Sequence, residues 1–131
     1  MAELDNLKLI HAILGISRPD VEILKILVEA TGVEQCLTVR EIACRLGKSR
    51  SSVERSVRKL LELGIVKRRV TLSRGGGYVY CYTARSREEV EKILLEKCRR
   101  IGDVLRRAIV ELLNEVYSRY VCGDCTNRAY T

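Results

Sequence analysis

Positive charge in this chain of 131 residues is concentrated between residues 38 and 85. This segment carries twelve Arg or Lys against three acidic residues, whereas the net charge of the whole chain is only +7. Its pattern also predicts an ordered series of elements, namely a short helix, a turn, a second helix and two strands around a glycine-rich loop. Charge gathered on one compact unit of this kind indicates a polyanionic partner with grooves, and DNA is the first candidate.

Length and composition limit the chain to one modest hydrophobic core, since 47% of its residues are hydrophobic and two independent domains would need a longer sequence. No apolar run reaches the roughly 20 residues that a membrane-spanning helix needs. The N-terminal sequence also lacks the basic region and the small-residue cleavage site of a signal peptide. We therefore expect a cytoplasmic, nucleoid-associated protein without a membrane partner.

The first part of the chain predicts two helices. Apolar residues at helical spacing indicate a short helix over residues 5–14. Ser17 and Asp20 form a signature of a helix start, in which side chains satisfy backbone N–H groups of the first turn. We expect this second helix to run to about residue 30. Its expected apolar stripe consists of Val21, Leu24, Leu27 and Val28.

The basic segment begins with the same signature at Thr38 and Glu41, which opens a short helix ending at Gly47. Ser49 caps the helix that follows, and the two sides of this helix differ in character. The apolar side consists of Val53, Val57, Leu60, Leu61 and Gly64, and the opposite side presents Ser51, Ser52, Arg55, Lys59 and Glu62.

Two strands are predicted after these helices, over residues 65–72 and 78–83, because β-branched and aromatic residues are frequent there. The glycine-rich loop between them supplies the backbone freedom that a two-stranded hairpin needs. Tyr78, Tyr80 and Tyr82 alternate onto one strand face, where we expect them to pack on the domain. RNA is therefore a poorer candidate than DNA, since RNA binding commonly uses exposed aromatic rings.

A third helix-start signature at Ser86 and Glu89 opens a helical pattern that continues to about Tyr120. At 1.5 Å per residue this helix is roughly 50 Å long, which exceeds the width of a small helical domain. We expect its apolar stripe to pair with the same helix of a second chain, in a parallel or an antiparallel homodimer. The alternative is a helix that folds back on its own core through a break at Gly102. The stripe consists of Ile93, Leu94, Ile101, Val104, Leu105, Ala108, Ile109, Leu112, Leu113 and Val116.

The stretch LTVREIACRLGKSRSSVERSVRKLLELGIVKRR, with the glycine loop that follows it, resembles the winged helix-turn-helix of small archaeal and bacterial transcriptional regulators of the MarR- and TrmB-like group. The resemblance covers about residues 17–95. It implies a mostly α protein with a small β hairpin, the α+β class, and the apolar stripe described above adds a long C-terminal dimerisation helix. We therefore expect a DNA-binding domain over residues 1–85, a dimerisation helix over residues 86–121 and a cysteine-containing tail over residues 122–131.

The resemblance further implies that residues 49–63 form a recognition helix whose N-terminal end enters the major groove of double-stranded DNA. Ser51, Ser52 and Arg55 would then face the bases. The chemistry is consistent, because Arg can donate two hydrogen bonds to guanine and Ser hydroxyls can serve bases or phosphates.

Further contacts are expected around this surface, with Arg50 and Lys59 on phosphates and Arg74 at the wing tip on the minor groove or its phosphates. Arg69 adds charge from the first strand. The complete set of expected DNA-binding residues is Ser49, Arg50, Ser51, Ser52, Arg55, Lys59, Arg69 and Arg74.

Cys122 and Cys125 form the only CxxC motif of the chain. Within one chain they make half of a four-ligand zinc site, which a dimer could complete, and they could instead form a local disulfide that responds to redox state. We favour a flexible tail that binds neither a metal nor a cofactor. The other four cysteines are expected to be small, buried and apolar, and these are Cys36, Cys44, Cys81 and Cys98.

The leading functional hypothesis is a sequence-specific DNA-binding transcriptional regulator that acts as a homodimer. One alternative is a winged-helix interaction module whose basic face meets an acidic protein, and another is a regulator that responds to redox state or metal through its CxxC tail. An enzyme is not expected, because the chain has no Walker-type loop and no Ser, His and acid grouping. The residues identify neither an operator nor a small-molecule effector.

Overall fold

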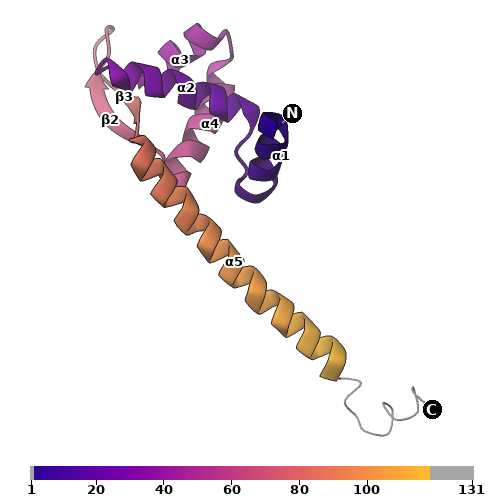
Figure 1. The fold of residues 1–131 in the computed structure, drawn as a ribbon. Coiled ribbons are helices and arrows are strands. Elements are labelled where there is room, and N and C mark those ends of the chain that lie inside the picture. The colour runs from indigo at the N-terminus through magenta and orange to yellow at the C-terminus, as the bar shows by residue number, and fades with distance from the viewer. Residues whose placement is uncertain (1, 119–131) are drawn as a thin grey trace, which may run out of the picture. The chain divides into compact units, whose positions relative to one another are not determined.

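The computed structural model describes residues 2–118, and the chain divides into two compact units, Met1–Ile93 and Leu94–Thr131. Figure 1 shows α2, α3 and α4 grouped near the hairpin of β2 and β3. This arrangement confirms the mostly α fold with a small sheet and a long C-terminal helix. The described elements are α1 (Ala2–Leu14), α2 (Arg18–Gly32), β1 (Leu37–Thr38), α3 (Val39–Leu46), α4 (Arg50–Leu63), β2 (Val66–Leu72), β3 (Tyr78–Ala84) and α5 (Arg87–Ser118).

Local capping determines where α3 and α4 begin and end. The Thr38 hydroxyl accepts the Glu41 N–H at 3.2 Å, and the Glu41 carboxylate accepts the Thr38 N–H at 3.0 Å. Gly47 and Gly64 end the two helices with φ angles of 65° and 82°, a conformation that glycine adopts without steric cost. The predicted starts and stops of both helices are therefore confirmed.

The sheet has three antiparallel strands in the order β1, β3, β2, so the expectation of a two-stranded hairpin was incomplete. β1 pairs Leu37 with Tyr82 and Thr38 with Cys81. A strand of two residues shows no alternation of polar and apolar side chains, which is why its sequence did not predict it. The β2–β3 register, from Val66 opposite Ala84 to Leu72 opposite Tyr78, makes the predicted wing.

The hydrophobic core lies between α2, α3, α4 and the base of the sheet. Of the four residues expected to form the stripe of α2, Leu27 is fully buried, whereas Val28 is 53% exposed and Val21 and Leu24 are half-buried. The expected stripe was right for Leu27 and wrong for Val28, because apolar residues surround this helix and a second stripe through Ile23, Leu27 and Ala30 also fits its pattern. The core residues include Ile23, Leu27, Ala30, Leu37, Ile42, Val53, Val57, Leu60, Ile65 and Val66.

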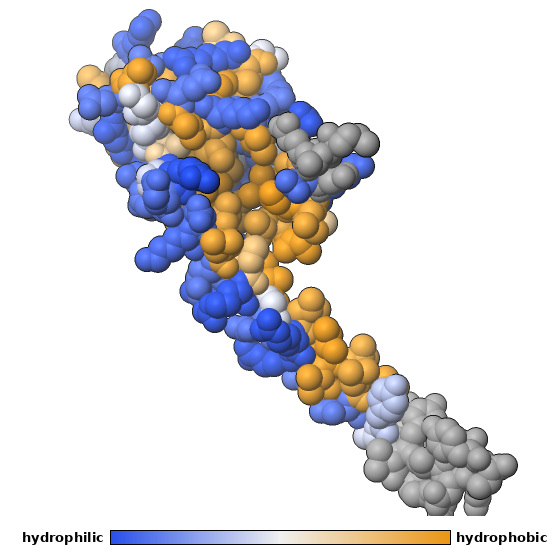
Figure 2. Space-filling view, in the orientation of Figure 1, coloured by the Kyte–Doolittle hydropathy of each residue, from blue (hydrophilic) through white to orange (hydrophobic). Residues whose placement is uncertain are grey.

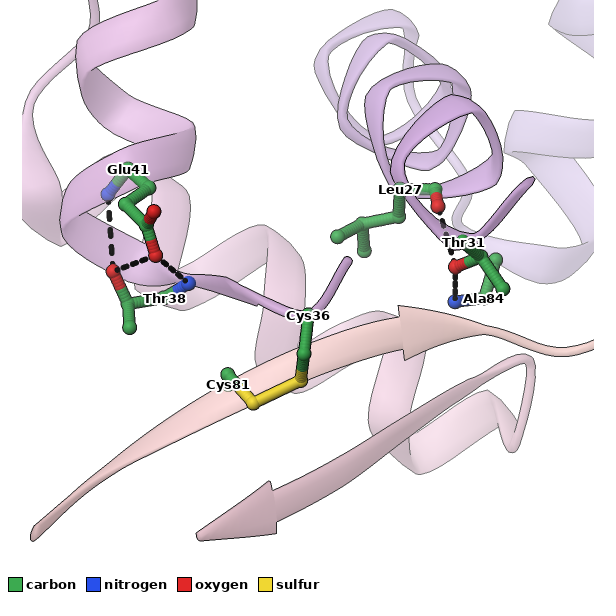
Figure 3. Close-up of a disulfide and its surroundings, with 7 residues drawn as sticks. All are labelled: Leu27, Thr31, Cys36, Thr38, Glu41, Cys81 and Ala84. Carbon is green, nitrogen blue, oxygen red and sulfur yellow. Dashed lines mark hydrogen bonds between the residues drawn. A yellow bond between two sulfur atoms is a disulfide. The ribbon is translucent and has the colours of Figure 1, made fainter. Parts of the chain in front are cut away.

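A disulfide joins Cys36, just before β1, to Cys81 in the middle of β3 (Figure 3). The expectation that the four scattered cysteines are buried held only for Cys81, which is bonded as well as buried. It was wrong for the other three, because Cys36 is half-buried and bonded, and Cys44 and Cys98 are free and exposed. The bond closes a segment with a sequence separation of 45, and the pairing of β1 with β3 brings its two ends together.

A buried ion pair joins α2 to α4. The Asp20 carboxylate is 1% exposed and accepts hydrogen bonds from Lys59 at 2.8 Å and from the Ser17 N–H at 2.8 Å. Lys59 also donates to the Gly15 carbonyl at 3.0 Å. Burial raises the pKa of the Asp20 carboxyl, but the hydrogen bonds from Lys59, Ser17 and Ser56 outweigh burial and hold its pKa below the usual 3.8.

The Asp20–Lys59 pair predicts a pH-dependent contribution to stability. Because the pKa of Asp20 is depressed in the folded chain, its contribution is complete above the unfolded pKa of about 3.9 and is lost as the pH falls through the folded value. Asp20→Asn should lower the free energy of unfolding by about 1–2 kcal/mol at neutral pH, a value reduced by the partial exposure of Lys59.

Urea unfolding at neutral pH and through the acid range would measure this difference, which should shrink below about pH 4. Glu22→Gln on the same helix is the control, since its bond to Lys48 joins two partly exposed side chains. An equal loss in both variants, or a loss that does not change with pH, would contradict the prediction.

The second unit contains the part of α5 that runs from Leu94 to Ser118. No residue of α5 is buried, and its apolar residues from Val104 onward are exposed. In Figure 2 they gather along one side of this part of the helix. No helix within residues 2–118 is long and apolar enough to cross a bilayer. The predicted end of the helix at residue 121 and the tail with Cys122 and Cys125 lie outside the described residues.

Candidate nucleic-acid interface

The N-terminal end of α4 presents the polar surface that the sequence predicts. Ser51 and Arg55 are exposed, and Ser52 is half-buried. Core residues Val53, Val57 and Leu60 occupy the other side of the helix, and their burial determines which side faces solvent.

Three serines form a hydroxyl cluster at this end. The Ser49 hydroxyl caps α4 by accepting the Ser52 N–H at 3.2 Å, and it donates to the Ser52 hydroxyl at 3.0 Å. The Ser51 hydroxyl lies 3.4 Å from the Ser49 hydroxyl. One backbone N–H of the first turn is thus satisfied internally, while the partial positive charge of the helix end remains beside exposed hydroxyls.

The predicted DNA-binding arginines are unpaired within residues 6–118, whose side chains the structure describes. Arg50, Arg55 and Arg74 are exposed and form no salt bridge there. By contrast, Arg99 and Arg106 on α5 are paired with Glu96 and Asp103. An unpaired arginine is available to bind a phosphate, since its guanidinium is not already neutralised by a carboxylate.

Lys59 differs from the other predicted DNA-binding residues. Its ammonium group is held by Asp20 and by the Gly15 carbonyl, so it points toward the N-terminal part of its own unit. The helical pattern placed Lys59 correctly on the polar side of α4 but did not show that α2 covers part of that side. The Lys59 ammonium group therefore already has two partners inside the protein.

The wing carries cations and exposed aromatic rings. Cross-strand neighbours share a sheet face, so Arg69 lies on the face of Cys81 and Arg68 on the face of Tyr82. The Arg68 guanidinium lies 4.2 Å from the centre of the Tyr80 ring. Arg74 lies in the exposed loop, where Gly76 and Gly77 have φ angles of 87° and 78°.

The expectation that the three tyrosines pack on the domain holds only for Tyr82, which is 7% exposed. Tyr78 is 78% exposed and Tyr80 is 49% exposed. Both residues lie at the exposed loop end of β3, whereas the buried part of this strand begins at Cys81. The argument against RNA that used these rings therefore does not hold for Tyr78 and Tyr80.

The first unit has counterparts among known proteins. Residues 14–75 match the model of the MarR family. A solved structure described as a possible transcriptional regulator from Methanosarcina mazei Go1 is 27% identical. The comparison covers 76% of this chain and 85% of that one, with a TM-score of 0.57. The first unit therefore has a winged-helix fold similar to that of the MarR family.

Two further similar proteins are archaeal. The protein ST1889 from the thermoacidophilic archaeon Sulfolobus tokodaii is 27% identical, with coverage of 80% of this chain and 99% of that one and a TM-score of 0.54. The uncharacterized protein MJ1503 of Methanocaldococcus jannaschii is 32% identical over 84 residues. That match spans 63% of this chain and only 64% of the length of the relative.

All of the predicted DNA-binding residues lie within the range that matches the MarR model. The match therefore agrees with the resemblance on which their roles depend, although it does not test any single contact. The described part of the chain contains no group of three or more His, Cys, Asp or Glu side chains that could hold a metal ion.

Proposed function

We propose that this chain is a sequence-specific, double-stranded DNA-binding transcriptional regulator that acts as a homodimer. The observation that carries the proposal is the polar end of α4, where Ser51 and Arg55 are exposed and the nearby arginines have no partner in the described structure. The MarR-like fold supports it, since this fold presents a helix of the same kind to the major groove.

In the proposed complex, the N-terminal end of α4 enters the major groove. Arg55 donates two hydrogen bonds to a guanine, and Ser51 contacts a neighbouring base or phosphate. Arg50 contacts the phosphate backbone, and Arg74 carries the wing loop onto the minor groove or its phosphates. Lys59 is left out of these contacts because its ion pair with Asp20 instead holds α4 against α2.

The second copy is proposed from the exposed stripe of α5. Leu105, Ile109, Leu112 and Val116 are 57%, 48%, 58% and 43% exposed. A contiguous exposed apolar stripe on a soluble protein marks a contact surface, and a two-fold dimer would cover the same stripe on both copies. Its target would then be a near-palindrome with half-sites about 34 Å apart or a multiple of that distance.

Two arginine variants test the proposed docking. Arg55→Ala should cost about 1–3 kcal/mol on the preferred duplex and should relax discrimination at one base position. Arg74→Ala should weaken binding to all duplexes by similar factors, because a phosphate contact carries no sequence information. The preferred duplex would first be selected from a random pool, and both variants would then be titrated on it and on a random duplex.

Arg100→Ala removes one arginine from α5 and is the matched control for lost charge. Unchanged affinity in both test variants would refute the proposed docking. The alternative of an acidic protein partner predicts no sequence-selective retention of duplexes at about 0.15 M salt, so the same titrations separate the two functions.

A further inference from the structure

A regular seam runs along α5 in the second unit and shares four residues with the apolar stripe that the sequence predicts. We define the seam as Leu95, Cys98, Gly102, Leu105, Ile109, Leu112 and Val116. These residues are spaced alternately three and four apart, which is the heptad spacing of two helices that pack side by side. None of them is charged, and none is buried in the described structure. The seam can therefore engage another helix along its whole length.

The seam is unequal in size at its two ends. Cys98 and Gly102 are small, whereas Leu112 and Val116 are large. Gly102 has no internal reason to be glycine, because a Cβ built there meets no atom of the described chain within 4 Å. A glycine inside a helix costs roughly 0.5–1 kcal/mol relative to alanine, so its presence suggests a helix that approaches closely from outside.

Orientation decides what these small residues would face. In a parallel pair each seam residue meets its own copy, so Gly102 would face Gly102 and leave a gap. In an antiparallel pair, Gly102 can face Leu112 and Cys98 can face Val116. Each small residue then receives a large one, as close packing requires.

Charge is also unequal along this part of α5. Residues 95–107 contain five basic and two acidic residues, whereas residues 108–118 contain two acidic residues and no basic one. A parallel pair would place the two basic halves together and the two acidic halves together. An antiparallel pair places each basic half beside an acidic half, which is the favourable arrangement.

We propose that α5 pairs with the same helix of a second copy in antiparallel orientation, with Gly102 opposite Leu112 and Cys98 opposite Val116. This inference rests on the homodimer of the proposed function and adds its orientation and register. The two-fold axis then passes near residue 107. The two chains enter the paired segment at opposite ends, with their residues 94 about 39 Å apart along its axis.

Cys98 is free and exposed, so it serves as a probe of orientation. The test uses a full-length chain in which Cys44, Cys122 and Cys125 are replaced by Ser and the Cys36–Cys81 disulfide is kept. In this background Cys98 should not bond to its own copy, because the two are about 27 Å apart along the axis. Adding Val116→Cys should give a covalent dimer under mild oxidation, joined between positions 98 and 116.

Non-reducing gels and mass spectrometry of the joined peptides would identify the bond, and Cys98→Ser with Val116→Cys is the matched control that should give none. Rapid bonding of Cys98 to its own copy would overturn the proposal in favour of a parallel pair. A dimer without any bond between positions 98 and 116 would overturn the proposed register. Light scattering on the uncrosslinked chain separates these results from failure of the proposed function, because a monomer would refute the homodimer itself.

Discussion

Replacing Ile109 with aspartate should leave the protein monomeric and should lower its affinity for a two-half-site duplex by about 100-fold or more. Ile109 is 48% exposed in the single chain and lies in the middle of the apolar seam. In a dimer it would be covered, and a carboxylate there would lose its water without gaining a partner. Each monomer would then bind one half-site without the gain that comes from linking two.

Arg107→Asp is the matched control, because it introduces the same residue two positions away and therefore about 200° around the helix. This control should remain dimeric. Light scattering would give the mass of each variant, and duplex titrations would give its affinity. A dimeric Ile109→Asp variant with full affinity would show that the seam is not the contact between copies.

Loss of the disulfide should be the largest change in stability. Cys36→Ser should lower the free energy of unfolding by about 2–4 kcal/mol, because an open chain gains the conformational freedom that the bond removes from a long segment. The sequence separation of 45 between the two cysteines places this bond among those that close long loops. Cys81 is buried, so the thiol that the substitution leaves there without a partner gains little stabilisation from solvent.

Thermal unfolding with and without a strong reductant would measure this effect. Reductant should lower the melting temperature of the parent chain and leave that of Cys36→Ser unchanged. Cys44→Ser, which removes a free and exposed thiol, is the control and should behave like the parent chain. Equal melting temperatures with and without reductant in the parent chain would contradict the prediction.

Local chemistry explains what the sequence predicted well. The starts at Thr38, Ser49 and Ser86 depend on side chains within three residues of the backbone groups that they satisfy. The stops at Gly47 and Gly64 depend on a single residue each. Such signals lie within a few neighbouring residues, so helix order and the hairpin could be predicted without knowledge of the tertiary fold.

Features that depend on distant residues were missed. The disulfide needs the pairing of β1 with β3, and two residues of strand gave no periodic signal. The ion pair of Lys59 needs Asp20, which lies 39 positions earlier on another helix. Exposure of Ser51 and Arg55 was predicted because helical periodicity decides it, while their contacts with bases stay a prediction.

The long helix continues beyond the first unit, from Leu94 to Ser118, without burying a single residue. Insertions or deletions of whole heptads in that stretch would leave the globular core untouched. Such changes in helix length would alter the distance between the two copies of the proposed dimer. No new recognition surface would have to evolve.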